Sequence, residues 1–217
     1  MRIEQILHLL RKEYGPRRWK PGEDPMSTLV ATVLSQNTTD VNSGRAFDSH
    51  MKAFGSWEAA AGASPSEIAR SIRLGGLGEI KARRIKGMLQ EIQQEQGGFD
   101  LEFLSGLSLA EAKAWLRKLP GVGPKTAACV LLFSLGRPAM PVDTHVLRVA
   151  RRLGLLRSKV NAERAHEILE DLIPAENVYE FHLHMVEHGR KVCKAQRPRC
   201  HICVLQELCP SATKTCG

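Results

Sequence analysis

Hydrophobic residues recur along this chain with the spacing of α-helices. Ile3, Ile6, Leu7 and Leu10 stand at positions i, i+3, i+4 and i+7, so residues 2–13 are predicted to form an amphipathic helix. Similar spacing predicts further helices over residues 25–34, 41–54, 80–92, 162–173 and 175–189. No stretch alternates between hydrophobic and polar residues, which is the pattern of a half-buried strand. We therefore expect an all-α protein.

Polar residues and a glycine indicate where several of these helices begin or end. Ser64 precedes Glu67 by three residues, and Ser108 precedes Glu111 in the same way. Both pairs have the pattern of a capping box, in which two side chains bond each other's backbone N–H groups at a helix start. Gly55 is predicted to stop the helix that begins near residue 41.

The composition narrows the class of partner. The chain has 217 residues, a formal net charge of +8 and a pI of about 9.4, which favour an anionic partner such as nucleic acid. Aromatic residues make up only 5%, so serial stacking of bases on aromatic side chains is not expected. No apolar run approaches the roughly 20 residues of a membrane span, and the N-terminus lacks the pattern of a signal peptide. We therefore expect a cytoplasmic protein.

The stretch from Leu119 to Lys125 reads L-P-G-V-G-P-K and combines a tight turn with a helix start. Gly121 and Gly123, with Val122 between them, would let the backbone approach another molecule closely, so these residues could bind a phosphate. An apolar run predicts a helix of about three turns from there to residue 135. Its positive end favours a neutral amine, which makes Lys125 a candidate nucleophile. A plain turn with a solvated lysine fits the same pattern.

Asp143 is a candidate partner for that lysine. It precedes an apolar-periodic segment and is predicted to cap a helix there. Residues 136–142 can span about 23–25 Å when extended, which is enough to bring Asp143 back beside Lys125. A carboxylate in that place could face a developing cation. Capping alone would also explain the residue.

Two further polar segments could contact DNA bases or phosphates. Residues 35–40 read S-Q-N-T-T-D, and their side chains could bond bases or could simply connect two helices, with Thr39 or Asp40 as the next cap. Four cations on one predicted helix either meet phosphates or form its solvated face, namely Lys81, Arg83, Arg84 and Lys86.

Four cysteines near the C-terminus form a C-x6-C-x2-C-x5-C array, which in a cytoplasmic protein indicates a metal rather than disulfides. Four thiolates suit either tetrahedral zinc or an iron–sulfur cluster. Zinc sites usually show two short claws of paired cysteines, whereas this array has one. The array consists of Cys193, Cys200, Cys203 and Cys209, while Cys129 is expected in the core and Cys216 near a loose chain end.

The segment L-P-G-V-G-P-K-T-A is followed by V-D-T-H, with its aspartate eighteen residues after the lysine. This combination resembles the helix–hairpin–helix DNA glycosylases, and most closely endonuclease III. The resemblance implies that the hairpin, through Gly121, Val122 and Gly123, grips DNA phosphates. It also implies that Lys125 attacks C1′ of a flipped nucleotide and that Asp143 assists.

The resemblance assigns roles to less distinctive motifs as well. Endonuclease III typically has S-A-Q-A-T-D where this chain has S-Q-N-T-T-D, so either Gln36 or Asn37 would fill the gap left by the flipped base. Leu77, between glycines, would wedge into the duplex, although a simple buried anchor also explains it. The cysteine array matches the loop of a [4Fe–4S] cluster, whose first segment would present three cations to phosphates, namely Lys194, Arg197 and Arg199.

The implied architecture has two helical domains with a DNA cleft between them. A helical barrel over residues 23–135 would carry the helix–hairpin–helix motif. Residues 1–22 and 136–217 would together form the domain with the C-terminal iron–sulfur cluster loop. The protein would act as a monomer on duplex DNA that contains damaged bases or abasic sites.

The implied function is base-excision repair. The enzyme would remove a damaged base, an oxidised pyrimidine in the first place, and cleave the backbone through a lysine Schiff base. A monofunctional mismatch or adenine glycosylase is one alternative, but such enzymes commonly lack the hairpin lysine, and the adenine type carries an additional domain. A non-catalytic hairpin module that only grips DNA is the other alternative, and it would need neither Lys125 nor Asp143.

Overall fold

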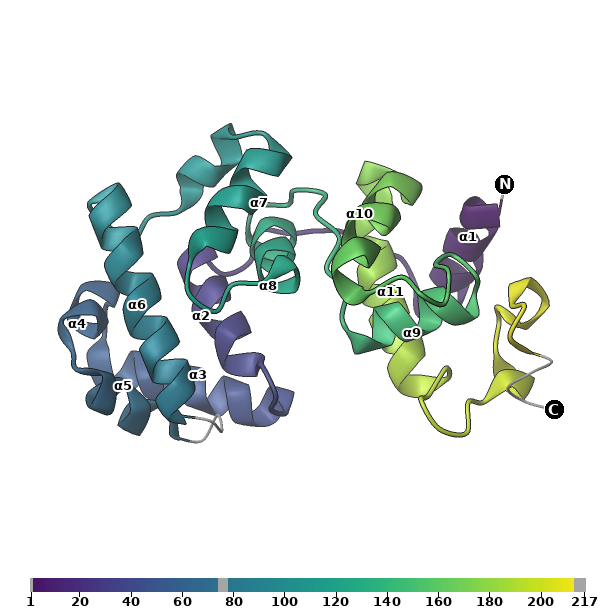
Figure 1. Cartoon of the computed structure of the whole chain (residues 1–217). Helices are drawn as coiled ribbons and strands as arrows, with labels where there is room; N and C mark the ends of the chain where they lie inside the picture. The colour runs from purple at the N-terminus through teal and green to yellow at the C-terminus, as the bar shows by residue number, and fades with distance from the viewer. Residues whose placement is uncertain (1, 74–77, 213–217) are drawn as a thin grey trace. The chain divides into compact units, whose positions relative to one another are not determined.

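The computed structural model describes residues 2–73 and 78–212, and within these residues all regular secondary structure is helical. The prediction of an all-α protein is therefore confirmed. The chain divides into two compact units (Figure 1). We call Pro21–Arg137 the hairpin unit, and Met1–Lys20 with Pro138–Gly217 the cluster unit. Over the described ranges, no helix combines the length and the hydropathy needed to cross a membrane.

The hairpin unit is built on α2 (Pro25–Ser35), a helix that is apolar on most sides. Seven of its residues are buried, and it packs against α3 (Asp40–Phe54), α6 (Gly78–Gln96) and α8 (Pro124–Cys129). A helix without a polar face is stable only inside such a bundle. The other elements of this unit are α4 (Trp57–Gly62), α5 (Pro65–Ser71), η2 (Glu102–Gly106), α7 (Leu109–Lys118) and η3 (Val130–Ser134).

Several helix starts follow the predicted caps. Both capping boxes are present, with Ser64 and Glu67 at the start of α5 and Ser108 and Glu111 at the start of α7. Thr39 is the residue that caps α3, because its side chain accepts a backbone hydrogen bond at 3.3 Å. These short polar motifs therefore fix the boundaries of helices whose interiors are set by apolar spacing.

The helix after the hairpin differs from the prediction. The pattern predicts a regular α-helix to residue 135, whereas α8 ends at Cys129 and the chain continues as the π-helical turn η3. Val130, Leu131 and Leu132 are all buried, so the wider turn keeps its apolar residues in the core. Hydrophobic spacing does not distinguish a single π turn from α-helix, and the prediction was wrong for that reason.

The cluster unit joins the first helix of the chain to the last. α1 (Arg2–Tyr14) packs against α11 (Val178–Lys191). The buried Glu180 accepts a hydrogen bond from Arg11 Nε at 2.8 Å and another from the Arg17 N–H at 2.8 Å. This carboxylate therefore ties both the helix and the segment after it to α11. The other elements are α9 (Thr144–Arg152), α10 (Ala162–Leu172), η4 (Ala175–Asn177), η5 (Cys200–Ile202) and η6 (Gln206–Leu208).

Candidate active site and cysteine cavity

The hairpin connects α7 to α8 through a turn that needs glycine. Gly121 has a φ of +80°, in the left-handed region, and the Val122 N–H closes the turn by donating to Leu119 O at 3.1 Å. A Cβ at Gly121 would lie only 2.6 Å from Arg84 Cδ, because the arginine side chain crosses directly over the turn. A larger residue here would therefore strain the backbone and displace the Arg84 side chain.

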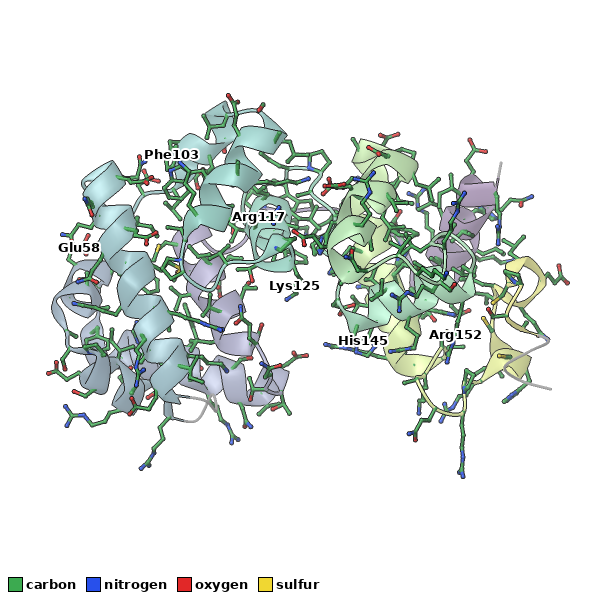
Figure 2. The ribbon with its side chains drawn as sticks, viewed as in Figure 1. Glu58, Phe103, Arg117, Lys125, His145 and Arg152 are labelled. Carbon is green, nitrogen blue, oxygen red and sulfur yellow. The ribbon has the colours of Figure 1, made fainter. Side chains whose placement is uncertain are left out.

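Lys125 is the second residue of α8 and follows the hairpin directly. Figure 2 shows its side chain extending from that helix. The residue is partly exposed, and no described residue forms a hydrogen bond or an ion pair with its ammonium group. The amine is thus available to a ligand bound at the hairpin.

Gln36 lies against the hairpin rather than pointing into solvent. Its Nε2 donates to Gly121 O at 3.0 Å and lies 3.5 Å from Thr126 Oγ1. Its Oε1 accepts a hydrogen bond from Arg84 at 2.9 Å. The side-chain amide is therefore engaged at both ends. Its neighbour Asn37 is exposed and has a φ of 53°, a left-handed conformation that asparagine adopts more readily than most residues.

Two of the cations on α6 serve the protein itself. Lys81 is only 2% exposed, and its Nζ donates to Leu34 O at 2.7 Å. Lys86 donates to Ala61 O. Both carbonyls lie in the last turn of a helix, where acceptors lack an intrahelical partner. The buried Lys81 can neither meet a phosphate nor lie on a solvated face, so both expectations were wrong for this residue. Arg83, whose side chain is 75% exposed, does lie on a solvated face.

Asp143 caps α9 as predicted. Its Oδ1 accepts a hydrogen bond from the Val146 N–H at 2.7 Å, and its carbonyl accepts one from the Leu147 N–H at 2.9 Å. An asparagine could make the same cap, so the cap by itself does not require a charge. Asp143 belongs to the cluster unit and Lys125 to the hairpin unit. Their meeting at one substrate stays a prediction.

The backbone that leads to this aspartate is held by two buried histidines and a half-buried glutamate. The Met140 N–H donates to Glu170 Oε1 at 2.7 Å, and Met140 O accepts from His166 Nδ1 at 2.7 Å. Pro141 O accepts from His182 Nδ1 at 2.9 Å. Because each imidazole bonds a carbonyl through Nδ1, that nitrogen must carry a proton in both histidines. Two helices, α10 and α11, thus fix the segment on which the capping aspartate stands.

The four cysteines of the array lie around one cavity of the cluster unit. Burial raises the pKa of the Cys203 thiol, and the nearby thiols of Cys193 and Cys209 raise it further, so these three sulfurs interact electrostatically. A cluster of iron and sulfide needs four cysteine sulfurs around one enclosed volume, and all four cysteines of the array line this one. Cys193, Cys203 and Cys209 are free thiols, whereas Cys200 is disulfide-bonded in this structure and would have to be reduced before it could bind iron. The lining includes Cys193, Cys200, Cys203 and Cys209 together with Val149, Leu153 and Val192.

Arg152 of α9, labelled in Figure 2, holds the loop between the first two cysteines of the array. Its guanidinium lies 3.3 Å from Cys193 Sγ and donates to Lys194 O at 2.6 Å and to Ala195 O at 3.0 Å. The backbone of the loop is therefore fixed while its cations face solvent. The exposed cations are Lys194, Arg197 and Arg199.

Tyr14 of α1 and the buried His188 of α11 form a hydrogen-bonded pair that reaches the cysteine cavity. Tyr14 Oη lies 2.8 Å from His188 Nδ1, and His188 Nε2 lies 3.5 Å from Cys203 Sγ. Burial lowers the pKa of His188 to about 4, so the imidazole is neutral at neutral pH and carries a single proton. The tyrosine hydroxyl can donate to Nδ1, which leaves the Nε2 proton for the sulfur.

Sequence reasoning did not single out the histidines that support these sites. A signal was present on α11, where Phe181, His184, Met185 and His188 occupy one buried stripe at helical spacing. A titratable residue inside an apolar stripe must find a partner, and this pattern could have identified His188. Of the other predicted residues, Cys129 is buried as expected, while Leu77 and Cys216 lie outside the described residues.

Two family models match the chain. Residues 30–175 match the HhH-GPD superfamily of base excision DNA repair proteins, and residues 193–209 match the iron–sulfur binding domain of endonuclease III. The second match begins and ends at the outer cysteines of the array, Cys193 and Cys209. It decides between the two metals left open above in favour of iron–sulfur.

Individual relatives agree with these models. Endonuclease III of Thermotoga maritima is 34% identical over 207 residues, which cover 95% of this chain and 92% of that protein. An Arabidopsis thaliana relative is 40% identical over 171 residues, and the chain spans 58% of its length. A solved structure of a trapped covalent intermediate of endonuclease III and DNA is 30% identical, with a TM-score of 0.85 over 99% of this chain and 97% of that chain. The chain therefore belongs to the endonuclease III family of the HhH-GPD superfamily, and it is a base-excision repair DNA glycosylase with a [4Fe–4S] cluster.

Proposed function

We propose that this glycosylase is bifunctional, and that it both removes a damaged base from duplex DNA and cleaves the backbone as an AP lyase. The observation that carries the proposal is the position of Lys125 just after the hairpin turn, where its amine has no partner among the described residues. The solved relative is a covalent endonuclease III–DNA intermediate, and such a bond requires a nucleophile on the protein. An oxidised pyrimidine is the base that we expect to be removed first.

In the proposed reaction, Lys125 Nζ bonds to C1′ of the damaged nucleotide while the bond from C1′ to the base breaks and the base leaves with a proton. The C1′–O4′ bond of the resulting aminal then breaks, O4′ takes a proton, and an iminium forms between C1′ and the lysine nitrogen. The iminium loses a proton from C2′, and the 3′ phosphate then leaves by β-elimination. Asp143 supplies the carboxylate that accepts the proton of the amine or stabilises the positive charge on the sugar. This role requires the negative charge of Asp143, whereas capping of α9 does not, because an asparagine caps a helix equally well.

We assign the grip on DNA phosphates to the hairpin and to the cysteine loop. Val122 is 7% exposed and its N–H is used within the turn, so the phosphate contacts fall to the backbone around Gly121 and Gly123. The four cysteines would each bind one iron, and the cluster would pin the loop that presents its exposed cations to the backbone of the duplex. The proposed contacts of the loop are Lys194, Arg197 and Arg199.

The gap left by the flipped base is assigned to Asn37. Its neighbour Gln36 has both ends of its amide engaged with the protein, whereas Asn37 is exposed. An exposed amide can donate to and accept from the unpaired base opposite. Leu77 keeps the role of wedge that the resemblance implies.

Borohydride trapping on duplex DNA with an abasic site tests the proposal, because it reduces a Schiff base to a stable bond. Wild type is expected to give a trapped complex, and Lys125→Gln none, with binding to the duplex retained. Lys118→Gln is the matched control, since it removes the same charge from an exposed lysine just before the hairpin and should still be trapped. Trapping of Lys125→Gln at the wild-type yield would assign the chemistry to another amine.

A panel of duplexes tests the substrate separately. Single-turnover base release should be fastest from a duplex with an oxidised pyrimidine and slower from one with an oxidised purine or a mismatch. Faster release from either of the latter would replace the proposed substrate and leave the lysine assignment standing.

A further inference from the structure

We infer that Gln36 is a positioning residue for the nucleophile. Together with Arg84 it locks the hairpin that carries Lys125 to the C-terminal end of α2, so that the amine and the gap-filling residue move as one body. This inference rests on the proposed function of Lys125 and Asn37. It gives Gln36 a role different from the gap-filling one that the sequence left open.

The first support is that both ends of the Gln36 side-chain amide form hydrogen bonds within the protein. Gln36 Nε2 donates to Gly121 O at 3.0 Å, and its Oε1 accepts from Arg84 Nη1 at 2.9 Å. Since an amide has one donor end and one acceptor end, this pair of bonds fixes its orientation. Thr126 Oγ1, one residue after the nucleophile, lies 3.5 Å from the same nitrogen. Gln36 thus contacts the hairpin on both sides of Lys125.

The second support is that Arg84 holds the turn by packing, in addition to its hydrogen bond to Gln36. The carbon stem of Arg84 lies over Gly121, where a Cβ would come within 2.6 Å of Cδ. One helical turn earlier on α6, Lys81 donates to Leu34 O at 2.7 Å. A single helix therefore grips both the end of α2 and the hairpin, and Gln36 bridges the two.

Asn37 follows Gln36 directly in the chain, and Lys125 follows the hairpin by two residues. A displacement of about 1 Å in a reacting group can cost as much as about 100-fold in rate, so such a bridge matters for a reaction that needs both residues in place. A chain with alanine instead of Gln36 would lack the bridge, because a methyl group can neither donate nor accept.

Hydrogen exchange tests the bridge without relying on the chemistry. Gln36→Met and Arg84→Met keep the length of each side chain and remove its polar atoms. Both should speed exchange of the amides in residues 119–126, and Arg83→Met, which removes the same charge from the solvated face of α6, should not. Unchanged protection of residues 119–126 in both variants would overturn the inference.

The second measurement is the single-turnover rate of borohydride trapping on an abasic duplex at saturating enzyme. Each variant should slow trapping about tenfold with a dissociation constant within about twofold of wild type, and the double variant should be no slower than the slower single one. Multiplied losses in the double variant, or a loss confined to binding, would contradict a shared positioning role. If wild type itself is not trapped, the proposed function fails, and the exchange measurement still decides whether the bridge exists.

Discussion

The two candidate catalytic residues stand at helix starts that are held in different ways. Lys125 follows a glycine turn that is fixed from outside by a partly exposed amide and an arginine stem. Asp143 follows a segment whose backbone at Met140 and Pro141 is held by two buried histidine bonds and by a half-buried glutamate. The hairpin therefore depends on shape, and the approach to the aspartate depends on buried donors and acceptors.

This difference teaches where each site is vulnerable. A buried carbonyl that loses its donor keeps the full cost of desolvation, about 1–3 kcal/mol, because water cannot replace the bond. A partly exposed bond can be exchanged for water at little cost, and what is lost is position rather than stability. Loss of a buried hydrogen bond near Asp143 should therefore affect folding and rate together, while loss of the partly exposed bonds near Lys125 should affect rate with little change in folding.

The largest effect in this comparison is expected at Asp143 itself. Asp143→Asn keeps the cap on α9, so the thermal midpoint should stay close to wild type. Base release should fall by about 100-fold, because the charge that we propose to act on the reacting sugar is gone. Single-turnover release from a damaged duplex measures the effect, and near wild-type turnover would reduce Asp143 to a cap.

Removal of a cluster ligand should destabilise part of the cluster unit and leave the hairpin unit unchanged. Cys203→Ser should lose the yellow-brown colour and the iron, about four atoms per chain in wild type. Because metal binding is coupled to folding, amide protection over residues 193–209 should fall. Protection in the hairpin unit serves as the internal control and should not change. Colourless, active wild-type protein with one zinc ion would overturn the cluster.

How much of this could be predicted from the sequence depends on the range of the interactions. Local motifs such as the capping boxes and the Asp143 cap were readable because their partners lie three residues apart. The bond from Gln36 to Gly121 spans 85 residues and that from His182 to Pro141 spans 41, so neither leaves a local pattern. Spacing could name candidates for the chemistry, but not the residues that hold those candidates in place.

The hydrogen bond from His182 to the segment before Asp143 can be tested by substitution, and we expect an effect of intermediate size. His182→Ala leaves Pro141 O without its donor and should cost about 1–3 kcal/mol in the free energy of unfolding. Base release should fall by about tenfold because the segment before Asp143 moves. His182→Asn offers an N–H near the place of Nδ1 and should recover part of both losses. Equal defects in the two variants would mean that packing, rather than the hydrogen bond, fixes the segment.

The smallest effect is expected at Gly121, on the side that depends on shape. Gly121→Ala forces a side chain into a left-handed backbone conformation, at a cost of about 1–2 kcal/mol, and its Cβ would meet the stem of Arg84. Arginine is flexible and can swing aside, but it then gives up its bond to Gln36. Trapping should slow by about threefold with the fold preserved, a smaller loss than that of Arg84→Met, because the turn keeps its own closing bond at Val122. Thermal unfolding beside trapping kinetics measures both quantities. A loss of stability larger than that of His182→Ala would reverse the comparison and make the hairpin the more rigid of the two sites.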